Sequence, residues 1–126
     1  MTFSVIDCSV MTRAEIGRAL SAYGKDTILV YLIMTADADG NKYSSTEATQ
    51  FVASKSNIPV FEATGLGIGN GILGGIVVSF SEMAADAAKI VLALGNGLDI
   101  ADYPIKEAKH YCIFDKEVMD KFGITQ

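Results

Sequence analysis

The stretch ATGLGIGNGILGGIVVSF, Ala63 to Phe80, decides how the fold of this chain is interpreted. It contains six glycines and no charged residue, and its last part, Ile76 to Phe80, is typical of a strand. Such a run fits three structures: a phosphate-binding loop, a membrane-spanning helix, or a loop beside a strand that lets a small ligand approach the backbone. Its neighbours in the sequence decide among them.

The phosphate-binding structure is disfavoured. Gly69-Asn-Gly-Ile-Leu-Gly74 matches G-x-G-x-x-G, but that fingerprint needs a strand before the glycines and a helix directly after them. Here the glycines precede a predicted strand, and the next acidic residues, Glu82 and Asp86, fall in a predicted helix. No G-K-[ST] follows either.

The membrane-spanning structure is disfavoured as well. The uncharged run is close to the ~20 residues that a spanning helix needs. Six glycines make it weakly hydrophobic and poorly helical, and no basic residues flank it. A loop at the carboxyl end of a strand remains, which is where open α/β sheets bind ligands. The alternative, that the glycines only shape a tight connection, stays open.

Composition narrows the function classes. The 126 residues fit one domain, and half of them are hydrophobic. A net charge of -5 with scattered basic residues argues against a nucleic-acid partner. Cys8 and Cys112 form no C-x-x-C motif, and the single histidine, His110, has no supporting cluster of ligands. We expect no metal site and no cofactor.

The order of predicted elements is that of an α/β protein. Strands are predicted at residues 2–7, 27–34, 58–61, 76–80 and 111–114. Helices alternate with them, which predicts a three-layer α/β sandwich with a mainly parallel sheet and right-handed crossovers. The run at 27–34 is continuously apolar, as in a strand buried on both faces.

Helix starts are predicted from capping boxes. The pattern S/T-x-x-E occurs at Thr12, Ser44 and Ser79. The helix after Ser79 carries apolar residues between Met83 and Leu94 and stops at Gly95. A last short helix begins at a capping Asp115 and is closed by Gly123, and residues 96–106 form the loosest segment.

Several motifs, taken in order, resemble one family. They are Ile58-Pro-Val-Phe61, Gly69-Asn-Gly-Ile-Leu-Gly-Gly75, Val77-Val-Ser79 and Ala84-Ala-Asp-Ala-Ala88. Their order is similar to the second half of the ABC-transporter substrate-binding-protein-like family, which has the type 1 periplasmic-binding-protein fold. The segments 26–32, 37–44 and 114–124 resemble the version that serves as extracytoplasmic sensor in histidine kinases and diguanylate cyclases.

The resemblance covers roughly Asp26 to Ile124 and implies one lobe of a two-lobe binding protein. The chain looks like the second lobe plus the closing segment, so its partner is a first lobe outside this sequence. No signal peptide is visible at the N-terminus, and the resemblance implies that the parent carries it, or a membrane anchor, upstream. It also implies an extracytoplasmic location, binding of an unknown small molecule, and no enzymatic activity.

Five residues would contact the ligand in such a fold. Thr35 and Asp37 follow the second predicted strand, Glu62 and Thr64 follow the third, and Asn70 lies in the glycine loop. The family's usual residue at the last position is histidine. Structural roles remain open for three of them, because Asp37 suits a turn, Glu62 suits solvent and Asn70 can stabilise its own turn.

Two other functions stay open. A small cytoplasmic α/β enzyme or nucleotide-binding domain would need a nucleophile–base pair or a phosphate loop, and a single histidine gives no convincing Ser/His/Asp set. A dimerising interaction module would use the apolar surface that a lone lobe exposes. The helix between Met83 and Leu94 can pack against another copy, so we expect a homodimer when the chain is studied alone.

Overall fold

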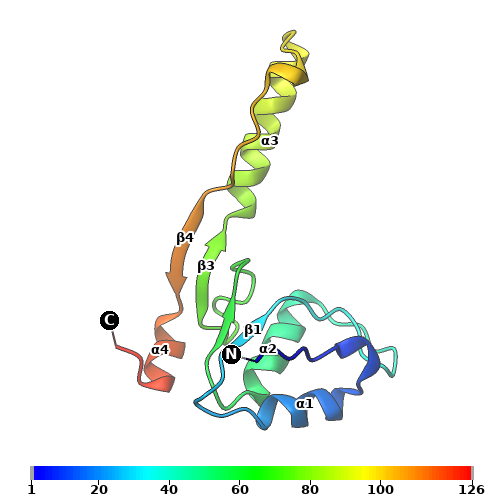
Figure 1. The fold of residues 1–126 in the computed structure, drawn as a ribbon, viewed down its shortest axis with the longest axis vertical. Coiled ribbons are helices and arrows are strands. Elements are labelled where there is room, and N and C mark those ends of the chain that lie inside the picture. Colours follow the sequence, from blue (N-terminus) through cyan, green and yellow to red (C-terminus); the bar gives the residue numbers. More distant parts are fainter. Residues whose placement is uncertain (1, 126) are drawn as a thin grey trace.

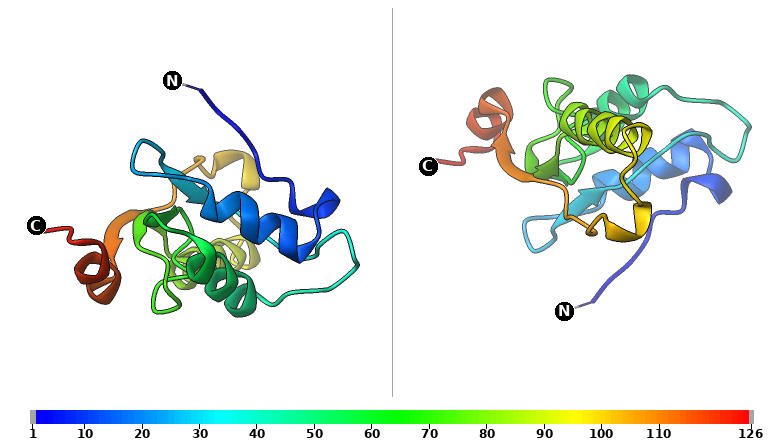
Figure 2. Two further views of the ribbon diagram at one scale, coloured as in Figure 1. Left: turned by 90° about the horizontal axis from the view of Figure 1, so that it is seen from below. Right: turned by 90° about the horizontal axis from the view of Figure 1, so that it is seen from above.

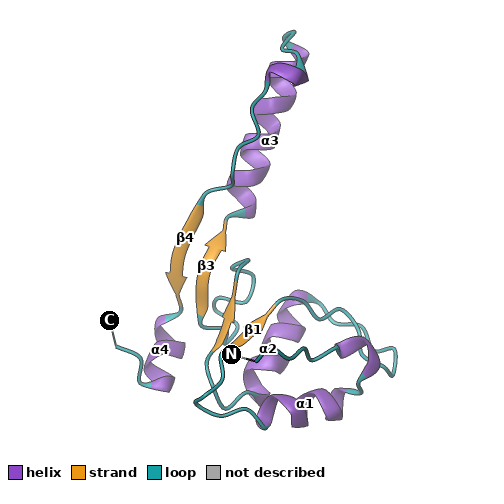
Figure 3. Ribbon diagram, viewed as in Figure 1, coloured by secondary structure: helices purple, strands orange, loops and turns teal. Residues whose placement is uncertain are grey.

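The computed structural model describes residues 2–125 and shows an α/β protein with a four-stranded mixed sheet (Figures 1 and 3). The strands, in their order across the sheet, are β1 (Leu29–Tyr31), β2 (Val60–Glu62), β3 (Gly74–Val78) and β4 (His110–Phe114). β2 pairs in parallel with β1 and β3, whereas β3 and β4 are antiparallel. The sheet is therefore only partly of the predicted parallel kind.

Four α-helices connect and follow these strands. They are α1 (Arg13–Ser21), α2 (Ser45–Lys55), α3 (Phe80–Gly95) and α4 (Lys116–Phe122), with short 3-10 turns at Cys8–Val10 and Ile100–Asp102. The capping boxes predicted for α1 and α2 are both confirmed. In each, the carboxylate of Glu15 or Glu47 accepts a hydrogen bond of 2.8 Å from the backbone N–H of Thr12 or Ser44.

The main core lies between α1, α2 and one face of β1 and β2. Ile16 and Leu20 of α1 meet Phe51 and Val52 of α2 over Val60 of β2, and all five are buried. The i, i+4 spacing of Ile16 and Leu20 places both on the inner side of α1, which explains why this short helix forms. Figure 2, left, shows α1 and α2 side by side from below.

α4 packs against the other face of the sheet. Its buried Val118 and Met119 contact Leu73, and the half-buried Phe61 of β2 joins this second cluster. Phe61 follows Val60 in the strand, so its side chain points to the opposite face. The predicted ends of α4 are confirmed: Asp115 accepts hydrogen bonds from two backbone N–H groups, and Gly123 closes the helix with φ +66°.

Two strand predictions were wrong. Residues 2–7 form no strand, and Phe3 and Val5 are 86% and 88% exposed. The run at 27–34 is a strand only at Leu29–Tyr31, and Val30 is half exposed. β1 lies at the sheet edge with β2 as its single neighbour, so the predicted burial on both faces does not occur.

α3 projects away from the sheet (Figure 1). We call α3 together with residues 96–109 the arm, and the rest of the described chain the body. α3 continues outward from the end of β3, and residues 96–109 return beside it to β4 (Figures 1 and 3). None of its sixteen residues is buried. Its end at Gly95 is as predicted, but the packing of its apolar residues onto the sheet that a sandwich requires is absent. Figure 2, right, views α3 nearly end-on.

The glycine stretch runs directly into β3, as predicted, although the strand begins at Gly74 rather than at Ile76. Gly74 has φ +105°, and a Cβ there would clash with the backbone carbonyl of Ile113 in β4. The close approach of β3 to β4 therefore requires glycine at this position. No helix among residues 2–125 has both the length and the apolar character needed to cross a membrane.

Candidate functional site

The carboxyl ends of β1 and β2 lie next to each other, at the same end of the two strands. The two strands are parallel, and their last residues, Tyr31 and Glu62, are paired in register. The loops that follow, residues 32–44 and 63–73, therefore start next to each other. This is the end of the strands at which the sequence places the candidate ligand contacts.

Glu62 and Thr64 are brought together at this end of the strands. The carboxylate of Glu62 is 3% exposed and accepts hydrogen bonds from the backbone N–H of Gly67 at 2.9 and 3.1 Å. The hydroxyl of Thr64 donates to the same carboxylate at 3.2 Å. Glu62 therefore folds the start of the glycine loop back over the strand end, because it supplies the acceptor that a buried N–H requires.

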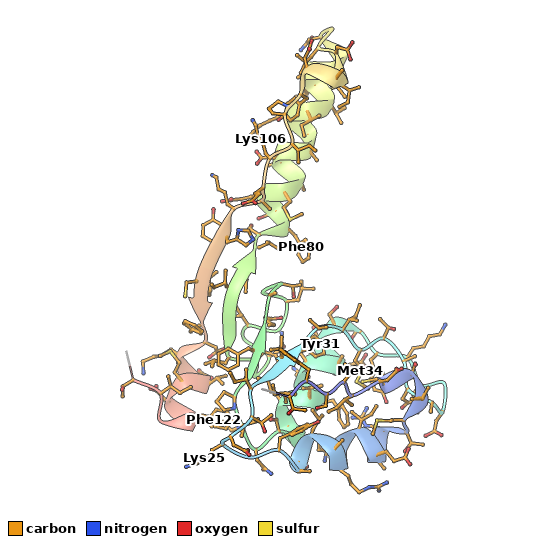
Figure 4. All side chains as sticks on the ribbon, in the orientation of Figure 1. Lys25, Tyr31, Met34, Phe80, Lys106 and Phe122 are labelled. Atoms are coloured by element: carbon orange, nitrogen blue, oxygen red, sulfur yellow. The ribbon has the colours of Figure 1, made fainter. Side chains whose placement is uncertain are left out.

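Tyr31 is a site residue that the sequence interpretation missed. Its phenol oxygen accepts a hydrogen bond of 3.1 Å from the backbone N–H of Met34, and both residues lie in the body, as labelled in Figure 4. Burial raises the pKa of the Tyr31 phenol, and the negative charge of Glu62 adds to that shift. The phenol therefore stays protonated beside the carboxylate. Its place as the last residue of a strand was the available signal.

Asp37 organises its own loop. Its carboxylate accepts hydrogen bonds from the hydroxyl of Tyr43 at 2.6 Å, the backbone N–H of Asp39 at 3.0 Å, and the backbone and side-chain N–H groups of Asn41. These bonds, that of Tyr43 foremost, hold the pKa of Asp37 below its usual range. With both oxygens engaged, the side chain acts here as a turn former.

Among the described residues, Thr35 and Asn70 make no side-chain hydrogen bond to Glu62 or Asp37. Thr35 is exposed, and its backbone carbonyl accepts a hydrogen bond of 2.9 Å from the N–H of Tyr43. Asn70 is half-buried, and its side-chain oxygen accepts a hydrogen bond of 3.3 Å from Gln50 of α2. The glycine loop is held on a second side by Asp115, whose carboxylate accepts from the N–H of Gly69 at 2.9 Å.

The carboxylates at the strand ends are engaged with the chain itself. Glu62 and Asp37 are both buried and accept hydrogen bonds from their own loops. His110 lies in β4 and is exposed. Among residues 2–125, no group of three or more His, Cys, Asp or Glu side chains has an arrangement that holds a metal ion. The two cysteines are free thiols, Cys8 half-buried and Cys112 exposed.

A hollow of the described surface lies elsewhere, over α1 and α2. It has a volume of about 910 Å³, and its lining includes Arg13, Arg18, Lys55 and Phe51. None of the five predicted contact residues lines it. Its residues are spread over two helices that are distant in the sequence, so only the packing of α1 on α2 brings them together.

Comparison with known proteins adds no relative: no protein-family model, no curated protein and no solved structure matches the chain. The fold defines the class of the protein as α/β, with a mixed four-stranded sheet and a projecting helical arm.

Proposed function

We propose that this chain is the ligand-binding or sensory lobe of a two-lobe extracytoplasmic receptor and has no catalytic activity of its own. The observation that carries the proposal is the arm. A sixteen-residue helix without a single buried residue projects from the body, so a second protein body is needed to cover it.

The apolar side chains of α3 support a partner over the arm. Phe80 is 49% exposed at its base, and Val91 and Leu92 are 68% and 67% exposed near its end. Isolated helices of this length are marginal in water, and most helical stability in proteins comes from packing an apolar face. In the proposed receptor, the first lobe provides that packing and closes over the ligand.

The strand ends support a ligand at the lobe surface. Four of the five predicted contact residues lie in the two loops that begin after Tyr31 and Glu62, and the fifth, Glu62, is the last residue of β2. A small molecule held there meets the exposed side chain of Thr35 and the half-buried side chains of Thr64 and Asn70, which suits a ligand with hydrogen-bonding groups. Closure of two lobes on such a molecule delivers it to a transporter or, in the sensor version, sends a conformational signal across a membrane.

The test uses the two-lobe parent protein in a thermal-shift screen against amino acids, nucleobases and small organic acids. We expect one class to raise the melting temperature, because a ligand that binds only the folded protein stabilises it. Thr35→Val should reduce that shift without altering the melting temperature of the free protein, since the side chain of Thr35 is exposed. Stabilisation by nucleotides of the present chain alone, with no response from the parent, would support the enzyme or nucleotide-binding alternative.

The same exposed arm favours a second candidate, a dimerising interaction module. Hydrogen exchange of the α3 amides separates the two. Protection that rises with the concentration of the chain alone indicates packing against a copy, whereas protection that appears only when the first lobe is present indicates the receptor. Fast exchange of α3 under both conditions would contradict both functions.

A further inference from the structure

Three basic side chains line the hollow over α1 and α2, which we term the basic groove. Arg13, Arg18 and Lys55 are exposed and line it together with the buried Gly17 and Phe51. One acidic residue, Asp39, also lines it. The local positive charge contrasts with the net charge of -5 of the whole chain.

The local structure holds two of these cations in place. The guanidinium carbon of Arg13 lies 4.2 Å from the ring centroid of Phe51, within the range of a cation–π contact. The aliphatic stem of Lys55 crosses Gly17, where an added Cβ would touch its Cγ and Cδ at 3.6 Å. The ion pairs found within residues 2–125 lie on α3 and α4 and include none of these groove cations. Glu15 and Glu47 are near enough to Arg18 and Arg13 for their charges to interact, but they accept hydrogen bonds from the helix caps.

The end of the arm has the complementary character. This arm tip, residues 96–103, carries Asp99 and Asp102 and has no basic residue. Leu98 comes directly before Asp99 and is 39% exposed, and Ile100 lies between the two acids and is 63% exposed. Asp99 shapes the tip, since its carboxylate accepts a hydrogen bond of 2.9 Å from the backbone N–H of Ala101.

We propose that the arm tip of one copy of this chain binds in the basic groove of a second copy. The tip joins carboxylates to apolar side chains, and the groove joins cations to an aromatic side chain, so charge and apolar surface match together. The tip lies at the opposite end of the molecule from α1, so it does not reach the groove of its own chain (Figure 1). The contact joins two different surfaces, head to tail.

This inference goes beyond the proposed receptor function and does not rest on it. A first lobe would cover the apolar side chains of α3 along the arm, whereas the self-association uses only residues 96–103 at its end. The two contacts are therefore independent, and loss of one leaves the other measurable.

Charge reversal on either side tests the proposal by sedimentation velocity. The groove variant is Arg13→Glu with Arg18→Glu, and the tip variant is Asp99→Lys with Asp102→Lys. We expect wild type to self-associate at low ionic strength and to dissociate at high salt, where opposite charges are screened. The self-association of each variant alone should be weaker than that of wild type by about tenfold or more, because like charges then face each other.

The decisive sample is an equal mixture of the two variants. The acidic tip of the groove variant meets the basic groove of the tip variant, and the reversed pair also matches, so association should return. A matched control, Lys25→Glu with Lys121→Glu, makes the same charge change away from the groove and should associate like wild type. The tip variant removes the hydrogen bond between Asp99 and Ala101 but changes only exposed residues of the arm, so it leaves the body folded even where the loss of the Arg13–Phe51 contact unfolds the groove variant.

Three outcomes would overturn the proposal. They are a wild type that stays monomeric at low salt, a variant mixture that stays monomeric while both components remain folded by circular dichroism, and a tip variant that associates like wild type. Titration with inorganic phosphate provides a further measurement by NMR. Shifts of the Arg13 and Lys55 signals at millimolar phosphate, without any self-association of the chain, would assign the groove to small anions instead.

Discussion

The hydroxyl of Tyr111 in β4 donates a hydrogen bond of 2.6 Å to the carboxylate of Glu82 in the first turn of α3. This bond joins the two ends of the arm at its base. Glu82 would complete the third predicted capping box, but only half of that box forms: the hydroxyl of Ser79 accepts a hydrogen bond from the N–H of Glu82 at 3.4 Å. The carboxylate is used to fasten the arm instead.

The bond to Glu82 should be visible in the titration of Tyr111. It holds the pKa of the Tyr111 phenol above its usual range, because the neutral phenol donates to the carboxylate. The folded pKa is raised, so the contribution to stability is complete below the ordinary tyrosine pKa of about 10 and is lost as pH rises through the folded value. In an absorbance titration of Glu82→Gln, one tyrosine should ionise at a lower pH than it does in wild type. An unchanged curve would show that the bond is absent in solution.

Removal of the Glu62 carboxylate should destabilise the body. Glu62→Ala leaves the buried N–H of Gly67 without its acceptor, and such a loss costs about 1–3 kcal/mol in the free energy of unfolding. Glu62→Gln is the control, since its amide oxygen still accepts one hydrogen bond, and it should lose less. Urea unfolding measures both variants. Equal stability of Glu62→Ala and wild type would contradict the role assigned to this carboxylate.

Two glycines of the stretch from Ala63 to Phe80 should differ in how well they tolerate substitution by alanine. Gly69 has φ +80° with open space at its Cβ position, so Gly69→Ala should cost about 1–2 kcal/mol from the backbone conformation alone. Gly74 combines φ +105° with a clash against the Ile113 carbonyl, so Gly74→Ala should cost more and weaken the β3–β4 pairing. Thermal unfolding ranks the two. A smaller loss of stability for Gly74→Ala than for Gly69→Ala would argue against this close pairing of β3 with β4.

Asp37 should make the protein sensitive to acid. Its pKa is lowered first by the hydrogen bond from Tyr43 and then by those from Asn41. The contribution to stability is therefore complete above the ordinary aspartate pKa of about 3.9 and is lost as pH falls through the lower folded value. Stability measured from pH 7 to pH 2 should fall less steeply for Asp37→Asn than for wild type. Parallel curves for the two proteins would contradict this assignment.

The predictions that the structure confirmed depend on neighbours in the sequence. The caps at Thr12, Ser44 and Asp115 involve groups two or three residues apart, so the pattern alone specifies them. Strands are different, because a strand exists only where a partner pairs with it. Residues 2–7 have the pattern without a partner, and residues 27–34 have a buried pattern at an exposed edge.

The features of the candidate site also divide into those that local sequence predicts and those that depend on contacts between distant segments. The sequence predicts that Glu62 and Thr64 lie at a strand end, and the structure adds the hydrogen bond between them. The engagement of Asp37 by Tyr43 follows from a short loop, and the sequence alternative of a turn former already pointed to it. Tyr31 and the basic groove were missed, since each depends on contacts between segments that are distant in the chain.

The sequence by itself determined the capped helix starts after Thr12, Ser44 and Asp115 and the helix ends at Gly95 and Gly123, because these follow from local backbone and capping chemistry. Only the tertiary structure decided the rest. It set the antiparallel pairing of β4, the exposed edge at β1 and the projection of α3 away from the sheet. The physical reason is that an apolar pattern requires burial but does not specify the surface that provides it.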